Sequence, residues 1–138
     1  MCLIPNLIIL VLAFWMASTA NLVAPSNSIS AHVLDIANGK PGVGVEITCF
    51  TLQSDGRWRH LGITKTDING RVPWVHPNDN LTIGTYKLGF GTKKYFETMG
   101  QKTFYPYVEI VFEVDDASKH YHVPLTLSNY GYTTYKGQ

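Results

Sequence analysis

Hydrophobic and polar residues alternate along most of the chain beyond residue 28, and residues 120–127 show the pattern most clearly. One set of positions in this stretch is apolar and consists of Tyr121, Val123, Leu125 and Leu127. The other set begins with two imidazole side chains, His120 and His122. A period of two is typical of a β-strand with one face in the core. The pattern therefore predicts a strand whose other face presents two groups that titrate near neutral pH.

Similar apolar patterns predict further strands, separated by turns rich in Gly, Pro, Asn and Asp. The expected strands are residues 29–36, 43–52, 58–66, 71–74, 84–91 and 105–114, with Pro73 keeping the short one at a sheet edge. In residues 43–52 we expect the inward side chains to be Val43, Val45, Ile47 and Cys49. Because only the turn 115–119 separates residues 105–114 from the histidine strand, we expect these two strands to form a hairpin. Residues 93–99, followed by Gly100, are the one segment with helical character.

Seven or eight short strands with regular turn signals indicate an all-β fold, a two-sheet β-sandwich with one short helix. A chain of 138 residues is long enough for one domain with a substantial core but short for two. We expect that domain to span residues 29–138.

The composition of residues 1–20 predicts a secretory signal peptide, which would not be part of the fold. The apolar run from Leu7 to Ala17 is short for a membrane span, and small residues lead to Ala20, where we expect cleavage. No Lys or Arg precedes the run, so an uncleaved anchor and a non-targeting extension are the alternatives. We expect a secreted or periplasmic protein, free of the membrane after cleavage, with residues 21–28 as a flexible lead-in. A cytoplasmic or peroxisomal location is less expected.

Cysteine count and charge narrow the possible functions. Cleavage would remove Cys2 and leave Cys49 alone, so no intrachain disulfide is expected. Cys49 lies in an apolar strand pattern, which is typical of a small buried hydrophobe rather than a reactive or intermolecular thiol. The 11 basic residues nearly balance the 10 acidic ones, and no basic stripe is visible, which argues against a nucleic-acid partner.

The histidines allow more than one kind of chemistry. His120 and His122 on one strand face could bind zinc with a third ligand, but no Cys, Asp or Glu lies at a helpful spacing, so we expect no metal. A serine hydrolase is not indicated, because no Gly-x-Ser-x-Gly motif occurs. His60 and His76 fit no motif, and we expect both at the surface.

Several motifs follow one another in a specific order over residues 30–138. They are Ser-Ala-His-Val-Leu-Asp at 30–35 with Gly-Lys-Pro at 39–41, Thr-Asp-Ile-Asn-Gly-Arg at 66–71, residues 104–112, His-Tyr-His-Val-Pro-Leu at 120–125 and residues 130–137. Together they resemble the transthyretin-like family, and within it the 5-hydroxyisourate hydrolases rather than the hormone-carrying transthyretins.

The resemblance implies a transthyretin-like sandwich assembled as a homotetramer, a dimer of dimers with active sites at the dimer–dimer interface. It also implies hydrolysis of 5-hydroxyisourate to 2-oxo-4-hydroxy-4-carboxy-5-ureidoimidazoline in urate degradation, without metal or organic cofactor. The residues that match the family's catalytic set are His32, Arg71 and His122, and of these His32 and Arg71 are also expected to bind the substrate. The family's substrate-binding tail, Tyr-Arg-Gly-Ser, corresponds here to Tyr135, Lys136, Gly137 and Gln138. Lys in place of Arg keeps the charge but loses the planar donor fork.

Hydrolysis of a cyclic amide requires three things. A base must take a proton from water, a group must stabilise the oxyanion that forms, and the site must bind the ring. A neutral imidazole suits the first task near pH 7, and either His122 or His32 is expected to be the base while the other positions the proton. Arg71 would bind the anionic ring and the developing negative charge, and Tyr135 would close the pocket. Taken singly, His32 and Arg71 are more typical of a hydrogen-bonded strand histidine and a solvated arginine, and Tyr135 of a packing residue. His122 alone fits a structural or a functional role equally well. The competing function is a secreted carrier of a small aromatic or hormone-like ligand.

Overall fold

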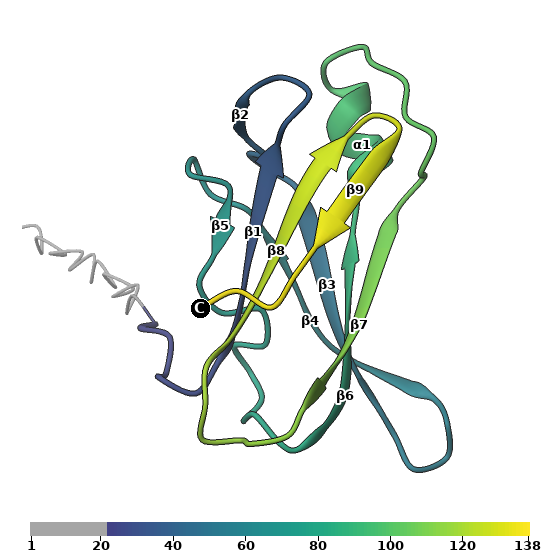
Figure 1. The fold of residues 1–138 in the computed structure, drawn as a ribbon. Helices are drawn as coiled ribbons and strands as arrows, with labels where there is room; N and C mark the ends of the chain where they lie inside the picture. The colour runs from purple at the N-terminus through teal and green to yellow at the C-terminus, as the bar shows by residue number, and fades with distance from the viewer. Residues whose placement is uncertain (1–21) are drawn as a thin grey trace, which may run out of the picture.

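Two β-sheets pack face to face in the computed structural model, which describes residues 22–138 (Figure 1). In the first sheet, β1 (Ile29–Asp35) and β8 (Tyr121–Ser128) are central, β9 (Gly131–Thr134) pairs with β8, and β2 (Lys40–Pro41) and β5 (Arg71–Val72) pair with β1. The second sheet has the order β4 (Trp58–Lys65), β3 (Glu46–Leu52), β6 (Gly84–Phe90), β7 (Val108–Val114). This arrangement confirms the predicted two-sheet sandwich.

The predicted signal peptide at residues 1–20, including Cys2, lies outside the described residues, as does the first residue of the predicted lead-in. Among residues 22–138, no helix has the length and apolar character needed to span a membrane. The single helix in the described part of the chain, α1 (Thr92–Glu97), confirms the predicted helical segment, and Gly100 follows it with a φ of +65°. That conformation favours glycine and stops the helix.

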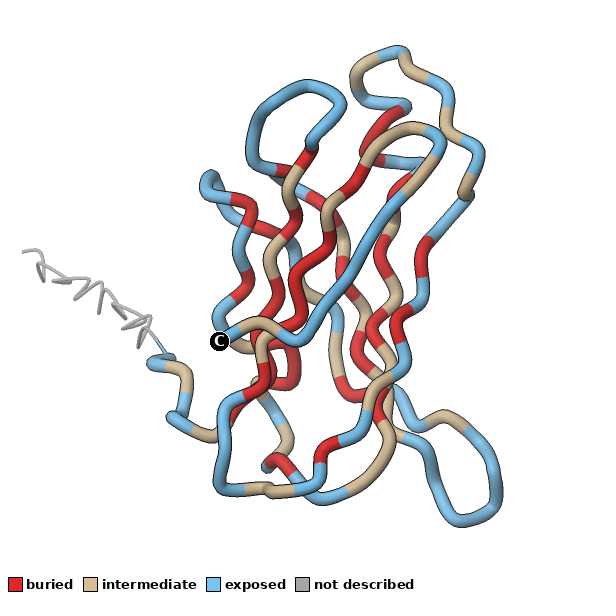
Figure 2. The backbone as a smooth tube through the Cα atoms, viewed as in Figure 1, coloured by how far each residue is buried: buried red, intermediate tan, exposed pale blue. Residues whose placement is uncertain are grey.

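The apolar faces of both sheets meet between them and form one core, red in Figure 2. Each long strand contributes to it, with Val33, Ile47, Leu61, Leu88, Val114 and Leu125 among the buried side chains. The alternation predicted for residues 105–114 and 120–127 is confirmed, because the side chains expected to face inward are buried or half-buried. Each such Val, Ile or Leu contributes roughly 1.5–3 kcal/mol of burial free energy. The faces away from the core remain free for polar groups.

The strands β1 and β8 run parallel, although 92 residues separate Ser30 from His122. Their register pairs Ser30 with His122 and His32 with Pro124. Side chains two residues apart on a strand share a face, so Ser30 and His32 project on the same side of β1. The topology therefore gathers Ser30, His32 and His122 on the outer face of one sheet.

The hairpin expected between residues 105–114 and 120–127 is wrong, because β7 and β8 belong to different sheets. The connection crosses the sandwich, and the N–H of Tyr121 donates to the carbonyl of Ser28 at 3.0 Å where β8 joins β1. The Tyr121 hydroxyl donates to the Asp115 carboxylate at 2.6 Å and holds the end of β7 nearby. Successive strands are spatial neighbours in only about two-thirds of cases. Alternation reports which face of a strand is buried and does not report which sheet the strand joins.

The strand predicted at residues 43–52 begins later than expected. Gly44 has a φ of +73° and turns the chain, so β3 starts at Glu46. Val43 is consequently 42% exposed instead of facing the core, whereas the other three predicted inward residues are buried. Cys49 is one of these, and burial raises the pKa of its thiol to about 12, so it is a small apolar residue as predicted.

The strand β9 is not among the strands predicted from the sequence. Residues Gly131–Thr134 pair with β8 but are largely exposed. An edge strand with no buried face has no alternating pattern by which to recognise it.

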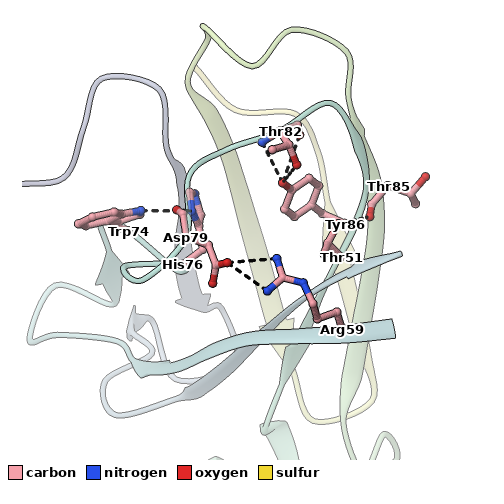
Figure 3. A network of polar contacts seen from close by, with 8 residues as sticks. All are labelled: Thr51, Arg59, Trp74, His76, Asp79, Thr82, Thr85 and Tyr86. Atoms are coloured by element: carbon pink, nitrogen blue, oxygen red, sulfur yellow. Dashed lines mark hydrogen bonds and ion pairs between the residues drawn. The ribbon is translucent and has the colours of Figure 1, made fainter. Parts of the chain in front are cut away.

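His76 is buried, which corrects the expectation that it lies at the surface; only 1% of it is exposed. Its Nε2 accepts the N–H of Ile29 at 3.0 Å, and its Nδ1 lies 2.9 Å from the carbonyl oxygen of Asp79. Figure 3 shows the ring beside Trp74 and Asp79, whose carboxylate pairs with Arg59 at 3.1 Å. A neutral ring with its hydrogen on Nδ1 satisfies both contacts. The loop turns inward because His76 supplies a partner for the first N–H of β1.

Candidate active site

A tight turn at the start of β5 holds Arg71. The Asp67 side chain accepts hydrogen bonds from the backbone N–H groups of Asn69 and Arg71, both at 2.9 Å. Gly70 has a φ of +73°, and a Cβ there would lie 2.5 Å from the carbonyl oxygen of Val33. Only glycine fits this close approach without displacing β1. The sequence Asp-Ile-Asn-Gly therefore fixes the backbone that leads into Arg71.

This turn places Arg71 beside His32, because the two residues are partners in the register of β1 and β5. The centre of the His32 ring lies 6.3 Å from the centre of the His122 ring. The structure thus brings together the three residues that the sequence singles out, from β5, β1 and β8. Within residues 22–138 Arg71 forms no salt bridge, so its guanidinium is available to an anion.

Both histidines of this group are held in the neutral form. Burial lowers the pKa of His32, and Arg71 lowers it further, against the opposing effects of a hydrogen bond to Asn69 and the charge of Asp67. Burial also lowers the pKa of His122, and the charges of Arg71, His32 and His120 act in the same direction. At neutral pH both rings are therefore unprotonated. A neutral imidazole can accept a proton from water.

The hydroxyl of Ser30 connects His122 with His120. Its Oγ lies 2.7 Å from Nδ1 of His122 and 2.9 Å from Nε2 of His120. Ser30 is only 7% exposed, whereas His120 is open to solvent. His120 is thus a neighbour of His122 through the serine rather than by direct contact.

A cavity of about 460 Å³ opens beside these groups. Its polar lining consists of Ser28, Ser30, Asp67, Arg71, His120, His122 and Gln138, and the segment from Ala24 contributes to one wall. His32 adjoins the cavity next to Arg71 and His122 without lining it. The volume falls within the range of small-molecule sites, roughly 300–1,000 Å³. The Arg71 guanidinium, which forms no salt bridge within residues 22–138, favours a small anionic ligand, and the imidazoles offer it hydrogen bonds.

The C-terminal tail folds back over His122. The pairing of β9 with β8 ends at Thr134, opposite Leu125, and the next residue of β8 is Pro124, which has no N–H to donate. Pairing resumes at Gly137, whose N–H donates to the carbonyl oxygen of His122 at 2.9 Å. Figure 1 shows the yellow tail running from β9 back across β8 toward β5.

The three predicted tail residues divide between two hollows. Gln138 lines the cavity that contains Arg71. Tyr135 and Lys136 instead line a neighbouring hollow of about 390 Å³, next to β7. There the Lys136 ammonium lies 5.6 Å from the centre of the Tyr121 ring. In the single chain, only Gln138 of the three lies with Arg71, and His122 lines both hollows.

A metal site needs several ligand side chains close together. Among residues 22–138, no group of three His, Cys, Asp or Glu side chains has such an arrangement. His122 and His120 point their facing nitrogens at the Ser30 hydroxyl. Arg71 stands beside His32 and His122, and its charge would repel a bound cation.

Sequence reasoning did not indicate Ser30 as part of this group, and it included Gly137 only as a member of the tail motif, without a contact to His122. A Cβ at Gly137 would lie 3.1 Å from Cγ of His122 and would collide with the remainder of the ring. Ser30 lies two residues before His32, and the signal that identifies it is the parallel register of β1 and β8. That register is visible only in the folded chain.

Known proteins share both the sequence and the fold. The model of the HIUase/Transthyretin family matches residues 29–137. A probable 5-hydroxyisourate hydrolase of Caenorhabditis elegans is 50% identical over 120 residues, which cover 87% of this chain and 88% of that protein. A 5-hydroxyisourate hydrolase of Salmonella typhi is 40% identical over 116 residues, 84% of this chain and 85% of that protein. The crystal structure of transthyretin from Sparus aurata has a TM-score of 0.75 at 27% identity, covering 80% of this chain and 97% of that one. The chain therefore belongs to the HIUase/Transthyretin family.

Proposed function

We propose that this protein hydrolyses 5-hydroxyisourate to 2-oxo-4-hydroxy-4-carboxy-5-ureidoimidazoline, a step of urate degradation. The hydrolases among its relatives support this activity. The structural observation that carries the proposal is the convergence of Arg71 with neutral His32 and His122 beside one cavity. A cationic group next to two proton acceptors suits the hydrolysis of an anionic cyclic amide.

The proposed mechanism uses His122 as the general base. Its Nδ1 contacts Ser30, so Nε2 is the nitrogen left to take a proton from water. The hydroxide oxygen then bonds to the ring carbonyl carbon, while Arg71 stabilises the oxyanion. The ring C–N bond breaks, the nitrogen receives a proton and becomes part of the ureido group, and the new carboxyl group ionises. His32 positions His122 and Arg71 from the neighbouring strand.

The direct test measures the decay of freshly generated 5-hydroxyisourate above its spontaneous rate. We expect His122→Asn to lower kcat by roughly 10²–10⁴-fold, the usual contribution of a general base. His60→Asn is the matched control, because His60 is an exposed histidine on β4 of the other sheet. An unchanged rate in His122→Asn would remove His122 from the mechanism, and a wild type without turnover would overturn the proposed function.

The competing carrier function predicts reversible binding of an aromatic ligand without turnover. Thyroxine displacement measured beside the hydrolysis assay separates the two functions. The cavity around Arg71 favours the hydrolase, because a guanidinium, a carboxylate and two imidazoles line it and suit a polar ligand better than an apolar one. Tight thyroxine binding in a protein that does not hydrolyse 5-hydroxyisourate would favour the carrier.

We further propose that the active form is a homotetramer. Two sheet edges, β7 and β9, are open in the single chain, and Val111 and Tyr132 on these strands are 56% and 38% exposed. Open edges with apolar side chains are typical of surfaces that pair with another chain. Light scattering on the purified protein is expected to give about four times the mass of one chain. A fully active monomer would contradict this proposal.

We also propose that residues 1–20 direct export and that cleavage follows Ala20. The apolar run from Leu7 to Ala17 and the small residues after it support this proposal. Amino-terminal sequencing of the protein recovered from its native source is expected to begin at Asn21. A sequence beginning at Met1 would overturn the cleavage.

A further inference from the structure

We propose that Ser30 and His120 form a proton relay that connects His122 with solvent, a role that rests on the proposed hydrolase function. The relay consists of three groups in contact: Nδ1 of His122, Oγ of Ser30 at 2.7 Å, and Nε2 of His120 at 2.9 Å from the same oxygen. The serine is almost fully buried, His122 is half-buried, the histidine beyond the serine is exposed, and all three line the cavity beside Arg71. The chain of contacts therefore leads from the half-buried His122 to a ring that is open to solvent.

The chemistry of the three groups gives this relay a direction. A serine hydroxyl carries one hydrogen, so between two ring nitrogens it donates to one and accepts from the other. When neutral His122 carries its hydrogen on Nδ1, that N–H donates to Ser30, and the Ser30 hydroxyl donates to Nε2 of His120. His120 then carries its own hydrogen on Nδ1. This arrangement leaves Nε2 of His122 unprotonated, as a general base requires.

The surroundings of His122 explain why it needs a relay. A second proton would make it an imidazolium beside the Arg71 guanidinium, and burial opposes that charge as well. The titratable or charged groups around His122 are His32 on β1, Arg71 on β5, Asp67 in the turn before β5, His120 directly before β8 and, across the neighbouring hollow, Glu113, Asp115 and Lys136. His120 faces the hydroxyls of Ser28 and Ser30 and open solvent.

The relay keeps His122 neutral in both halves of the reaction. When water gives a proton to Nε2 of His122, the Nδ1 proton moves to Ser30, the Ser30 proton moves to Nε2 of His120, and His120 releases its Nδ1 proton to solvent. When Nε2 then protonates the leaving ring nitrogen, the three transfers run in reverse and His120 takes a proton back from solvent. Water has supplied one hydrogen to the ureido group, and the new carboxylic acid releases the other to solvent. No oxidant, metal or second substrate is involved in this sequence.

Ser30→Ala interrupts the relay and leaves Arg71 and both catalytic imidazoles in place. We expect kcat to fall roughly 10- to 100-fold, a part of the 10²–10⁴ that a general base contributes, with KM changed much less. Ser30→Thr keeps the hydroxyl and is expected to restore most of kcat. His120→Gln removes the outer member and is expected to lower kcat in the same way, whereas His60→Gln, an exposed histidine of the other sheet, is the matched control.

The readout specific to a relay is rescue by a small proton carrier. Imidazole added to Ser30→Ala or His120→Gln is expected to raise kcat in proportion to its concentration, and to leave the wild type unchanged. The acidic limb of the kcat profile is expected to move to higher pH in His120→Gln, because the substitution removes one of the groups that lower the pKa of His122.

Three outcomes distinguish this relay from its alternatives. A wild type without turnover overturns the proposed function itself. An active wild type with a Ser30→Ala variant that matches it in kcat and pH profile overturns the relay alone. A Ser30→Ala variant that loses activity together with thermal stability, and that neither imidazole nor Ser30→Thr restores, assigns Ser30 to packing and also overturns the relay.

Discussion

Gly137 lies against the imidazole of His122 so closely that the ring occupies the space a side chain at residue 137 would need. A Cβ there would approach Cγ of His122 to 3.1 Å and Cβ to 3.3 Å. The same glycine donates its N–H to the His122 carbonyl at 2.9 Å. The tail and the proposed general base therefore hold one another in position, and neither is free to move without the other.

Gly137→Ala is the most direct test of that contact. The added methyl group must displace either the tail or the His122 ring, and a displacement of about 1 Å at a reacting group costs roughly 10²-fold in rate. We expect kcat to fall by about that factor in the 5-hydroxyisourate assay, with little change in thermal stability because the tail is outside the core. Gly131→Ala is the control, since its Cβ would meet only Ser128 Oγ at an ordinary 3.7 Å. Equal activity in the two variants would separate the tail from catalysis.

Arg71→Lys tests whether the guanidinium binds the substrate as a fork or merely supplies charge. Lysine keeps the charge but cannot make two parallel hydrogen bonds to a planar anion. Loss of one charge-assisted hydrogen bond, about 1.5–3 kcal/mol, is expected to lower kcat/KM roughly 10- to 100-fold. Arg57→Lys is the matched control, because the Arg57 side chain is 83% exposed in a hairpin of the other sheet. A KM and kcat indistinguishable from the wild type in Arg71→Lys would rule out the forked contact.

The pH dependence of kcat/KM follows from the neutral histidines. Burial and then Arg71 lower the pKa values of His32 and His122 below their ordinary value of about 6.5. The base is active when unprotonated, so kcat/KM is expected to stay constant from pH 8 to about 6.5 and to fall only at lower pH. In Arg71→Gln the remaining activity is expected to fall at a higher pH, because the neighbouring charge is gone. An acidic limb at an unchanged pH in Arg71→Gln would mean that another group controls the pH dependence of kcat/KM.

Lys136 and Gln138 occupy different hollows, which leads to different expectations for the two tail substitutions. Lys136→Met removes a contact with the Tyr121 ring, worth about 0.5–1 kcal/mol at an exposed site, so kcat/KM is expected to change two- to fivefold at most. Gln138→Ala removes a polar group from the cavity that contains Arg71, and KM is expected to rise further than in Lys136→Met. The reverse order would show that Lys136 reaches the substrate in the assembled protein.

The buried His76 predicts a loss of stability in mild acid. Burial lowers its pKa, so between that value and about 6.5 the unfolded chain binds a proton that the folded chain does not. The free energy of unfolding contributed by His76 is therefore complete above about pH 6.5 and decreases as pH falls, by at most about 1.4 kcal/mol per pH unit. Denaturant unfolding of His76→Gln, which keeps an acceptor for the Ile29 N–H, is expected to depend less steeply on pH. Parallel curves for the two proteins would show that His76 binds protons equally in the folded and unfolded states.

The local features of this fold can be predicted from the sequence, and its long-range pairings cannot. Alternation identifies the buried faces of β7 and β8, and the Asp-Ile-Asn-Gly pattern identifies the turn before Arg71. The same patterns wrongly pair β7 with β8, because a period of two contains no information about the partner strand. His76 escapes notice since its partner, the N–H of Ile29, lies 47 residues earlier in the chain.

In the candidate site, too, the motif residues can be predicted from the sequence and the long-range contacts cannot. His32, Arg71 and His122 can be named from motifs, whereas the Ser30 contact depends on the register of two strands that are distant in sequence. The close approach of Gly137 depends on how the tail returns after Pro124 interrupts the pairing.

The parallel pairing of β1 with β8 also sets an order of events during biosynthesis. The strand β1, which carries His32, leaves the ribosome long before β8, because 92 residues separate Ser30 from its partner His122. Contacts between residues so distant in sequence form slowly and only after both strands have been made. A nascent polypeptide that lacks β8 therefore contains no working site.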